Sequence, residues 1–352
     1  MTPSGRRWLR GAALLAFGLL LVAFGRHVEW RTAGMAVRDA DPVLLLVALV
    51  LNQLSLTLKG VRWWVLLRPL GVRSLSLVLR ATFAGASLNN LVVAQGGEGA
   101  RVVLVSRATG VSSAHIAGAL ALERVLDAVS YLTLLVGAML VLDMPAALMR
   151  WRMGACVALA LSIAALVALS VVAPPVARAA PARSRLHAYL HRFIASVAES
   201  GSPGRLASAM LLSLCAWGLQ VATYHTIALA AHLPMPVAGS VAAMLAIGVS
   251  FLIRATPGNV GVFQVIYALT AASYGVARGP AVATALLIQT VQVLPTIVLG
   301  MLAGHGFAAR RTSAQDPRRP SHLGAPAAGR AESAFRVSIN AKREHRDAGD
   351  SV

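Results

Sequence analysis

The chain has 352 residues, of which 57% are hydrophobic and 13% are charged, and its mean hydropathy is +0.70. A soluble domain carries about a quarter charged residues, so this composition excludes an ordinary soluble enzyme and a disordered chain. Lysine and arginine outnumber aspartate and glutamate by 32 to 13. These basic residues lie mainly between apolar runs, which argues against nucleic acid as a partner. The sequence therefore predicts an all-α, polytopic membrane helix bundle.

Nine apolar runs approach the length of about 20 residues that a spanning helix requires. In chain order they cover residues 8–25, 43–58, 75–94, 113–142, 153–173, 206–231, 237–253, 258–274 and 281–303. No segment between them is long enough to form a globular domain. The chain is therefore predicted to consist of a transmembrane domain over residues 1–305 and a tail over 306–352.

The third run, 75–94, is a poor lipid-facing helix. It contains Asn89 and Asn90 and leads into the glycine-rich segment 95–99. Irregular backbone at membrane depth is tolerated only inside protein or against water. We therefore expect this run to enter and leave the membrane on the cytoplasmic side, and the fold to have about eight spanning helices plus one or two re-entrant segments.

The distribution of basic residues supports this arrangement. With the N-terminus inside, the cytoplasmic segments, among them 59–74, 95–112 and 174–205, carry 24 basic residues and the external loops carry 6. A re-entrant eighth run would give about 18 against 12, which fits the positive-inside rule less well. The segment 183–193 alternates arginine with apolar residues and predicts an amphipathic interfacial helix, and the composition of the basic tail predicts disorder.

Three ionisable residues lie inside the fourth apolar run. Glu123, Arg124 and Asp127 stand about 15 to 21 Å along a helix that begins near residue 113, and ionisable groups at that depth are costly. Glu123 and Asp127 share one helix face. The triad is either an internally neutralised structural unit or a polar site for a charged headgroup, in which the carboxylates balance charge or couple protons.

A second polar motif is Gln-Gly-Gly-Glu-Gly-Ala-Arg at 95–101. The glycines allow close backbone approach, and a helix that begins near Glu98 would present free N–H groups to an anion with Arg101 at hand for phosphate. The alternative is a tight turn closed by a local Glu98–Arg101 ion pair.

The third motif, Arg-Ala-Thr-Pro-Gly-Asn-Val-Gly at 254–261, breaks the helix between the seventh and eighth runs. Asn259 can cap the new helix, and Gln264 follows one turn later. Arg254 either snorkels to the inner interface or contributes to a site of the kind that transporters build at broken helices. In the ninth run, Gln289 and Gln292 are more typical of helix–helix hydrogen bonds.

Chemistry outside the membrane is not indicated by any motif. No nucleophile–base pair, phosphate-binding loop or metal-ligand cluster appears on an extramembrane segment. We therefore predict no enzymatic activity, no catalytic residues, no cofactor and no metal site.

Taken in order, these motifs resemble the flippase-like family of the lysylphosphatidylglycerol synthase transmembrane region, over about residues 8–305. The chain departs from the family pattern at residues 93–95, where members commonly carry Pro-x-Arg, and at Gln264, where members often carry Glu. The bifunctional members add a soluble aminoacyl-transfer domain, which the 47-residue tail does not resemble, so we expect no synthesis of lysyl-lipids. The matching residues are Arg62, Ser87, Asn89, Asn90, Gly97, Glu98, Arg101, Glu123, Arg124, Asp127, Pro257, Gly258 and Gly261.

The resemblance implies movement of an anionic or glycosylated membrane lipid between leaflets. Two other functions stay open: a non-transporting scaffold that binds envelope-lipid biosynthesis proteins, and a small-solute permease. Abundant Arg and Ala are associated with GC-rich bacteria, and we expect a multi-pass protein of a bacterial inner (cytoplasmic) membrane with both termini cytoplasmic. The expected headgroup-binding residues are Asn89, Asn90, Glu98, Arg101, Glu123, Arg124, Asp127, Arg254, Asn259 and Gln264.

Overall fold

The computed structural model describes residues 30–91, 96–178, 185–250, 259 and 261–314. These residues form α-helices and one short 3-10 helix, and they contain no β-strand. The chain divides into two units, Met1–Phe307 and Ala308–Val352, and of the second unit only the last turns of a helix that ends at Ala314 are described. The first apolar run, at 8–25, and residues 315–352 of the predicted tail lie outside the described residues. Residues 306–314, predicted to be disordered, instead continue the last helix.

Long apolar helices form the frame of the first unit. They are α3 (Pro42–Leu67), α6 (Ser113–Val141), α8 (Arg152–Arg178), α10 (Pro203–Ala230) and α13 (Arg278–Ala314). Within the described part of the chain, four stretches are long and apolar enough to cross a membrane, namely Pro42–Leu70, Ser113–Val141, Pro203–Ala230 and Arg278–Gly304. Their outward side chains are largely apolar, for example on α3 and α8. This architecture confirms the prediction of an all-α membrane bundle.

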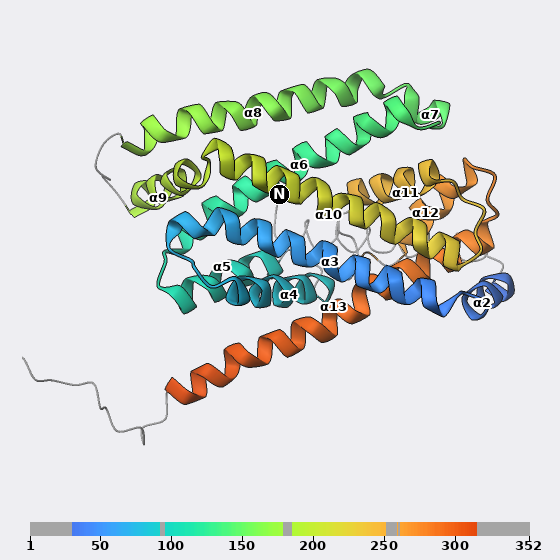
Figure 1. The fold of residues 1–352 in the computed structure, drawn as a ribbon, viewed down its shortest axis with the longest axis horizontal. Helices are drawn as coiled ribbons and strands as arrows, with labels where there is room; N and C mark the ends of the chain where they lie inside the picture. Colours follow the sequence, from blue (N-terminus) through green and yellow to red (C-terminus); the bar gives the residue numbers. More distant parts are fainter. Residues whose placement is uncertain (1–29, 92–95, 179–184, 251–258, 260, 315–352) are drawn as a thin grey trace, which may run out of the picture. The chain divides into compact units, whose positions relative to one another are not determined.

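Helices α3 and α10 lie side by side along their length (Figure 1). The Asp41 N–H donates to the Ala230 carbonyl at one end, and the Ser55 hydroxyl donates to the Ala216 carbonyl over 2.8 Å further along. Asp41 also caps α3, because its carboxylate accepts from the Val43 N–H over 2.8 Å. The start of α3 and the end of α10 therefore mark one end of the bundle.

Helix α3 continues beyond the predicted end of the second run. The sequence places residues 59–74 in a cytoplasmic segment, whereas the structure keeps Lys59 and Arg62 within the helix, which ends at Leu67. The helix tolerates Arg62 because carboxylates of another helix neutralise it, and the neighbouring Trp63 and Leu66 are fully buried. The predicted excess of basic residues on the cytoplasmic side therefore rests on other residues, such as those of 174–205.

The third apolar run forms a helical hairpin. Helix α4 (Leu75–Leu91) packs against α5 (Gly96–Thr109), and the two helices lie alongside each other in Figure 1. At 17 and 14 residues they are about 26 and 21 Å long, shorter than a hydrocarbon core of about 30 Å. This is the geometry expected of a re-entrant segment that begins and ends at the Leu67 end of α3.

Glycines let the hairpin close. A Cβ atom on Gly97 would lie 2.0 Å from the carbonyl oxygen of Gly85, and one on Gly85 would lie 2.5 Å from the Arg101 side chain. The Asn89 side chain accepts a hydrogen bond of 2.9 Å from the Gly97 N–H. From the sequence, we expected these glycines to let the backbone approach a ligand. In the structure they let α4 and α5 pack closely against each other.

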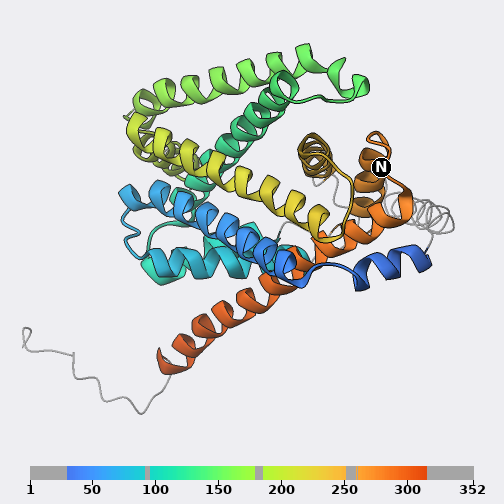
Figure 2. The same ribbon diagram turned by 45° about the vertical axis from the view of Figure 1, so that its right-hand side comes forward.

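Residues of the seventh and eighth apolar runs form a second pair of short helices. Helix α11 (Val237–Ser250) packs against α12 (Val262–Ala272), and α12 begins after Gly261, whose φ is 88°. The described helices have 14 and 11 residues, about 21 and 17 Å. The pair thus packs as a second helical hairpin, and Figure 2 shows it beside α13. Residues 251–258 and 260 between the two helices lie outside the described residues, so the two spans expected here stay a prediction.

The two hairpins open at opposite ends of the bundle. Helix α4 follows α3 through the 3-10 helix Arg68–Leu70, at the Leu67 end. Helix α11 follows α10 at the end where Ala230 bonds to Asp41.

Between α8 and α10, the helix α9 (Arg185–Ser200) occupies the place of the predicted interfacial helix. It packs against α6 and α8. The Ser200 hydroxyl donates to the Leu66 carbonyl over 2.8 Å, which joins the end of α9 to the end of α3. The helix is therefore confirmed, and its predicted position on a membrane surface stays a prediction.

Candidate functional site

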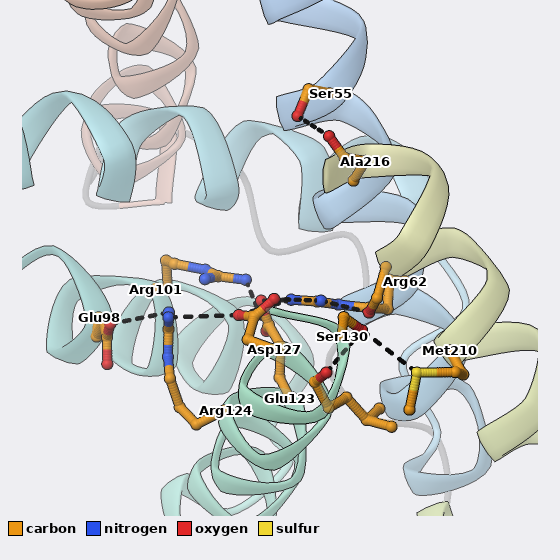
Figure 3. Close-up of polar contacts among 12 residues, drawn as sticks. Ser55, Arg62, Glu98, Arg101, Glu123, Arg124, Asp127, Ser130, Met210 and Ala216 are labelled. Atoms are coloured by element: carbon orange, nitrogen blue, oxygen red, sulfur yellow. Dashed lines mark hydrogen bonds and ion pairs between the residues drawn. The ribbon is translucent and has the colours of Figure 1, made fainter. Parts of the chain in front are cut away.

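A buried arginine on α3 is the centre of a network of ion pairs (Figure 3). Arg62 is fully buried, and its Nη2 lies 2.8 Å from Glu123 Oε1 while its Nη1 lies 2.5 Å from Asp127 Oδ1. Its Nη1 also donates to the Ser213 hydroxyl of α10 over 2.6 Å. One guanidinium thereby links α3, α6 and α10.

The hairpin helix α5 joins the same network by crossed pairs. Arg101 Nη2 lies 3.1 Å from Glu123 Oε2, and Arg124 Nη2 lies 2.8 Å from Glu98 Oε1. Glu98 and Arg101 therefore do not form the local pair considered from their spacing, because α5 packs against α6 and brings opposite charges closer. The Arg101 guanidinium also lies over the Trp63 ring, 4.1 Å from its centroid.

The charge network, defined here as Arg62, Glu98, Arg101, Glu123, Arg124 and Asp127, contains three guanidiniums and three carboxylates. Its charges balance, and its centre is closed: the Arg62 and Glu123 side chains are 1% and 2% exposed, against 49% for Arg124. A buried ion pair stabilises a fold mainly in the sense that loss of one partner is costly. The structure thus favours the structural interpretation of the Glu123–Asp127 motif, with Arg62 as the neutralising partner.

A polar cavity of about 290 Å³ lies one turn along α3 from the network. Its wall comes from α3, α4, α10, α11 and α13, so that both hairpins and the long helices meet around it. Polar lining in an apolar bundle is expected where a solute or water is admitted. The residues that line it are Asn52, Leu56, Lys59, Ala86, Asn90, Trp217, Gln220, Tyr224, Met244, Ile247, Gly248, Gln292 and Thr296.

Lys59 is the charged residue among those that line this cavity. Its Nζ lies 4.8 Å from the centroid of the Trp217 ring, a cation–π contact. Within the described ranges, no Asp or Glu oxygen lies within ion-pair distance of Lys59. The cavity therefore has a net positive wall, whereas the charge network is neutral.

The predicted headgroup-binding residues separate into groups. Asn90 lines the cavity, Asn89 fastens the first hairpin, and Arg254 lies outside the described residues. The remaining predicted residues of α5 and α6 form the charge network. The described members of the set therefore lie in separate places, and of these only Asn90 contributes to the cavity wall.

At the second hairpin, Gln264 has a helix-packing role. Its Oε1 accepts from the Gly261 N–H over 2.6 Å, which caps α12, and its Nε2 donates to Gln289 Oε1 over 2.5 Å. The prediction of an interhelical hydrogen bond for Gln289 is confirmed. Asn259 is 2% exposed and has a φ of 58°, so it lies buried beside the start of α12.

Sequence reasoning missed the cationic wall of the cavity. Lys59 was assigned to a loop, although Asn52, Leu56 and Lys59 recur at helical spacing and share one face of α3. Lys59 is also one of only two lysines in the chain, the other being Lys342. Among the described residues there is no group of three or more His, Cys, Asp or Glu side chains that could hold a metal ion.

A family model described as the lysylphosphatidylglycerol synthase TM region matches residues 11–300. The matched range includes every described helix of the bundle up to the outer part of α13. A comparison with curated proteins finds no match.

Proposed function

Because the chain belongs to the family of the lysylphosphatidylglycerol synthase TM region, we propose that it is a lipid translocase that moves an anionic or glycosylated lipid between membrane leaflets. It is a membrane protein of a lipid-related family. The observation that carries the proposal is the polar cavity between the two hairpins and the long helices. A lipid headgroup cannot cross hydrocarbon without polar partners, and this cavity offers them at membrane depth.

The size of the cavity fits a headgroup and not a whole lipid. At about 290 Å³ it lies at the lower limit of small-molecule pockets, which measure roughly 300–1,000 Å³. The acyl chains would therefore stay in the bilayer while the headgroup occupies the cavity. The short helices α4 and α11 contribute to its wall, so a shift of either hairpin would change access to it.

Reconstitution tests the proposal. Purified protein is placed in phosphatidylcholine vesicles that contain a trace of lipid with a fluorescent label on its headgroup, and an impermeant reductant bleaches the label in the outer leaflet. We expect wild-type protein to bring inner-leaflet label to the outside, so that bleaching proceeds further than in protein-free vesicles. Unchanged bleaching for anionic, sugar-linked and zwitterionic probes alike would contradict the proposal.

A matched pair of variants connects transport to the cavity. The double substitution Asn52→Leu, Gln220→Leu removes two amides from the wall and should slow transport about tenfold or more, since polar groups left without partners are costly. The control is Ser208→Leu on the same helix as Gln220, where an exposed hydroxyl bonds only to its own helix at Gly204. Equal transport rates in the double variant and the control would show that transport does not depend on the cavity.

The inner-membrane location and the cytoplasmic placement of both termini belong to the same proposal. Their support is the distribution of basic residues, which gather at the end of the bundle where α5 ends and α6 begins, and in 174–205. The scaffold alternative predicts a different result from deletion of residues 306–352. A scaffold that docks proteins through its tail should lose function, whereas a translocase should keep most of its vesicle activity.

A further inference from the structure

Lys59, which is partly buried, differs from the buried arginines of the bundle. Arg62, one turn along α3, uses both nearby carboxylates, Glu123 and Asp127. Lys59 faces the cavity with an aromatic ring as its contact partner. By the 1.5 Å rise per residue it lies about 12 Å inside the Leu67 end of its helix, where a cation that makes no ion pair is costly, and among the described residues Lys59 makes none. Such a residue is typical of ligand sites rather than of packing.

The groups around Lys59 are neutral and suited to oxyanions. Asn52, Asn90, Gln220 and Gln292 bring amide groups to the cavity wall. Gln292 lies beside Tyr224 on this wall, and its buried Nε2 makes no hydrogen bond of standard geometry with the described residues. Among the described residues that line the cavity there is no carboxylate. A phosphate diester would complete both the charge and the hydrogen bonds, because it presents acceptor oxygens and no donor.

We propose that this cavity binds the phosphate group of an anionic phospholipid, with Lys59 as the cationic contact and the surrounding amides as donors. The proposal rests on the proposed function and narrows its cargo from anionic or glycosylated lipids to phosphate-bearing anionic ones. From the sequence, we expected phosphate recognition by Arg101, which is paired with Glu123 in the structure. The proposal assigns it instead to Lys59, which the sequence places in a predicted cytoplasmic segment. Trp217 holds the ammonium of Lys59 against α10 and so directs it to the cavity.

Binding can be measured without transport. Full-length protein in a neutral detergent is mixed with equimolar phosphatidylglycerol and phosphatidylcholine, and the bound lipids are quantified by mass spectrometry after re-purification. We expect wild-type protein to retain phosphatidylglycerol in preference. Lys59→Gln should reduce that preference about tenfold, and Lys59→Arg, which keeps the charge, should restore most of it. The matched control is Arg107→Gln, the same loss of charge at an exposed position on α5.

A competition arm identifies the source of the phosphate. Inorganic phosphate at millimolar concentration is added to the same mixture. If phosphatidylglycerol stays bound, the cavity is a lipid site. If phosphate releases it from the wild type but not from Lys59→Gln, the cavity accepts free phosphate, which supports the permease alternative. Equal phosphatidylglycerol preference in wild type, Lys59→Gln and Arg107→Gln would overturn the assignment of Lys59.

The vesicle assay separates the two proposals. If wild-type protein transports lipid and Lys59→Gln transports phosphatidylglycerol and phosphatidylcholine as the wild type does, the assignment of Lys59 fails and the translocase stands. If wild-type protein binds phosphatidylglycerol through Lys59 and moves no lipid, the translocase fails and the anion site stands. A correctly folded Lys59→Gln protein is verified by its gel-filtration profile and thermal transition.

Discussion

Two cationic residues one turn apart on α3 have opposite environments. Arg62 is enclosed by the carboxylates Glu123 and Asp127 and by a serine hydroxyl, and it is fully buried. Lys59 lies beside Trp217 on the wall of a polar cavity. The comparison teaches that burial of charge in a membrane bundle has two uses, because a neutralised group joins helices whereas a charge left for a ligand creates a site.

The largest expected effect separates the two residues directly. Arg62→Leu leaves Glu123 and Asp127 partly uncompensated in the bundle, and removal of one partner from a buried ion pair costs about 3–5 kcal/mol. Lys59→Leu removes a charge with no carboxylate partner among the described residues, so the stability of the protein should be unchanged or higher. Thermal unfolding in detergent, followed by intrinsic fluorescence, measures both.

The contrary result has a clear meaning. If Lys59→Leu unfolds at a temperature as low as Arg62→Leu, the lysine is a structural residue and the distinction between network and cavity fails. If both variants match the wild type, the ion pairs of Arg62 contribute little net stability and the network must serve another purpose.

The next effect concerns the hairpin that carries Arg101 and Asn90 to their places. Gly97→Ala forces a methyl group to within 2.0 Å of the Gly85 carbonyl, and such overpacking costs about 1–3 kcal/mol or more. Gly99→Ala is the matched control on the same helix, since nothing lies within 4 Å of its Cβ position. There alanine should stabilise the helix by up to about 1 kcal/mol.

Thermal unfolding of the two alanine variants is compared with binding of phosphatidylglycerol. We expect Gly97→Ala to lower both the transition temperature and the lipid preference, because Asn90 would leave the cavity wall when α4 and α5 separate. A Gly97→Ala protein as stable as Gly99→Ala would show that the hairpin closes in another way than described.

Much of the fold was predictable from the sequence, because hydropathy alone marks the long helices and the polar third run. The packing of α11 against α12 was not predictable, since composition does not say which helices pair. The partners of Glu98 and Arg101 were not predictable, because ion pairs between helices depend on packing rather than on spacing within one helix. Lys59 was missed because the predicted apolar run ends at residue 58. Arg62 lies within the bundle because it pairs with carboxylates 61 and 65 residues further along the chain.

The smallest expected effect lies at the open edge of the charge network. The Arg124 side chain is 49% exposed while it pairs with Glu98, which is 22% exposed. A half-exposed guanidinium is costly in hydrocarbon, so we expect the exposed face of this pair to border water. In water such a pair contributes about 0.2–1 kcal/mol and is screened by salt. Arg124→Ala should therefore lower stability by less than Arg62→Leu, with a difference from wild type that shrinks as salt rises. A loss of stability as large as that of Arg62→Leu, and independent of salt, would place this edge of the charge network in lipid and contradict its expected contact with water.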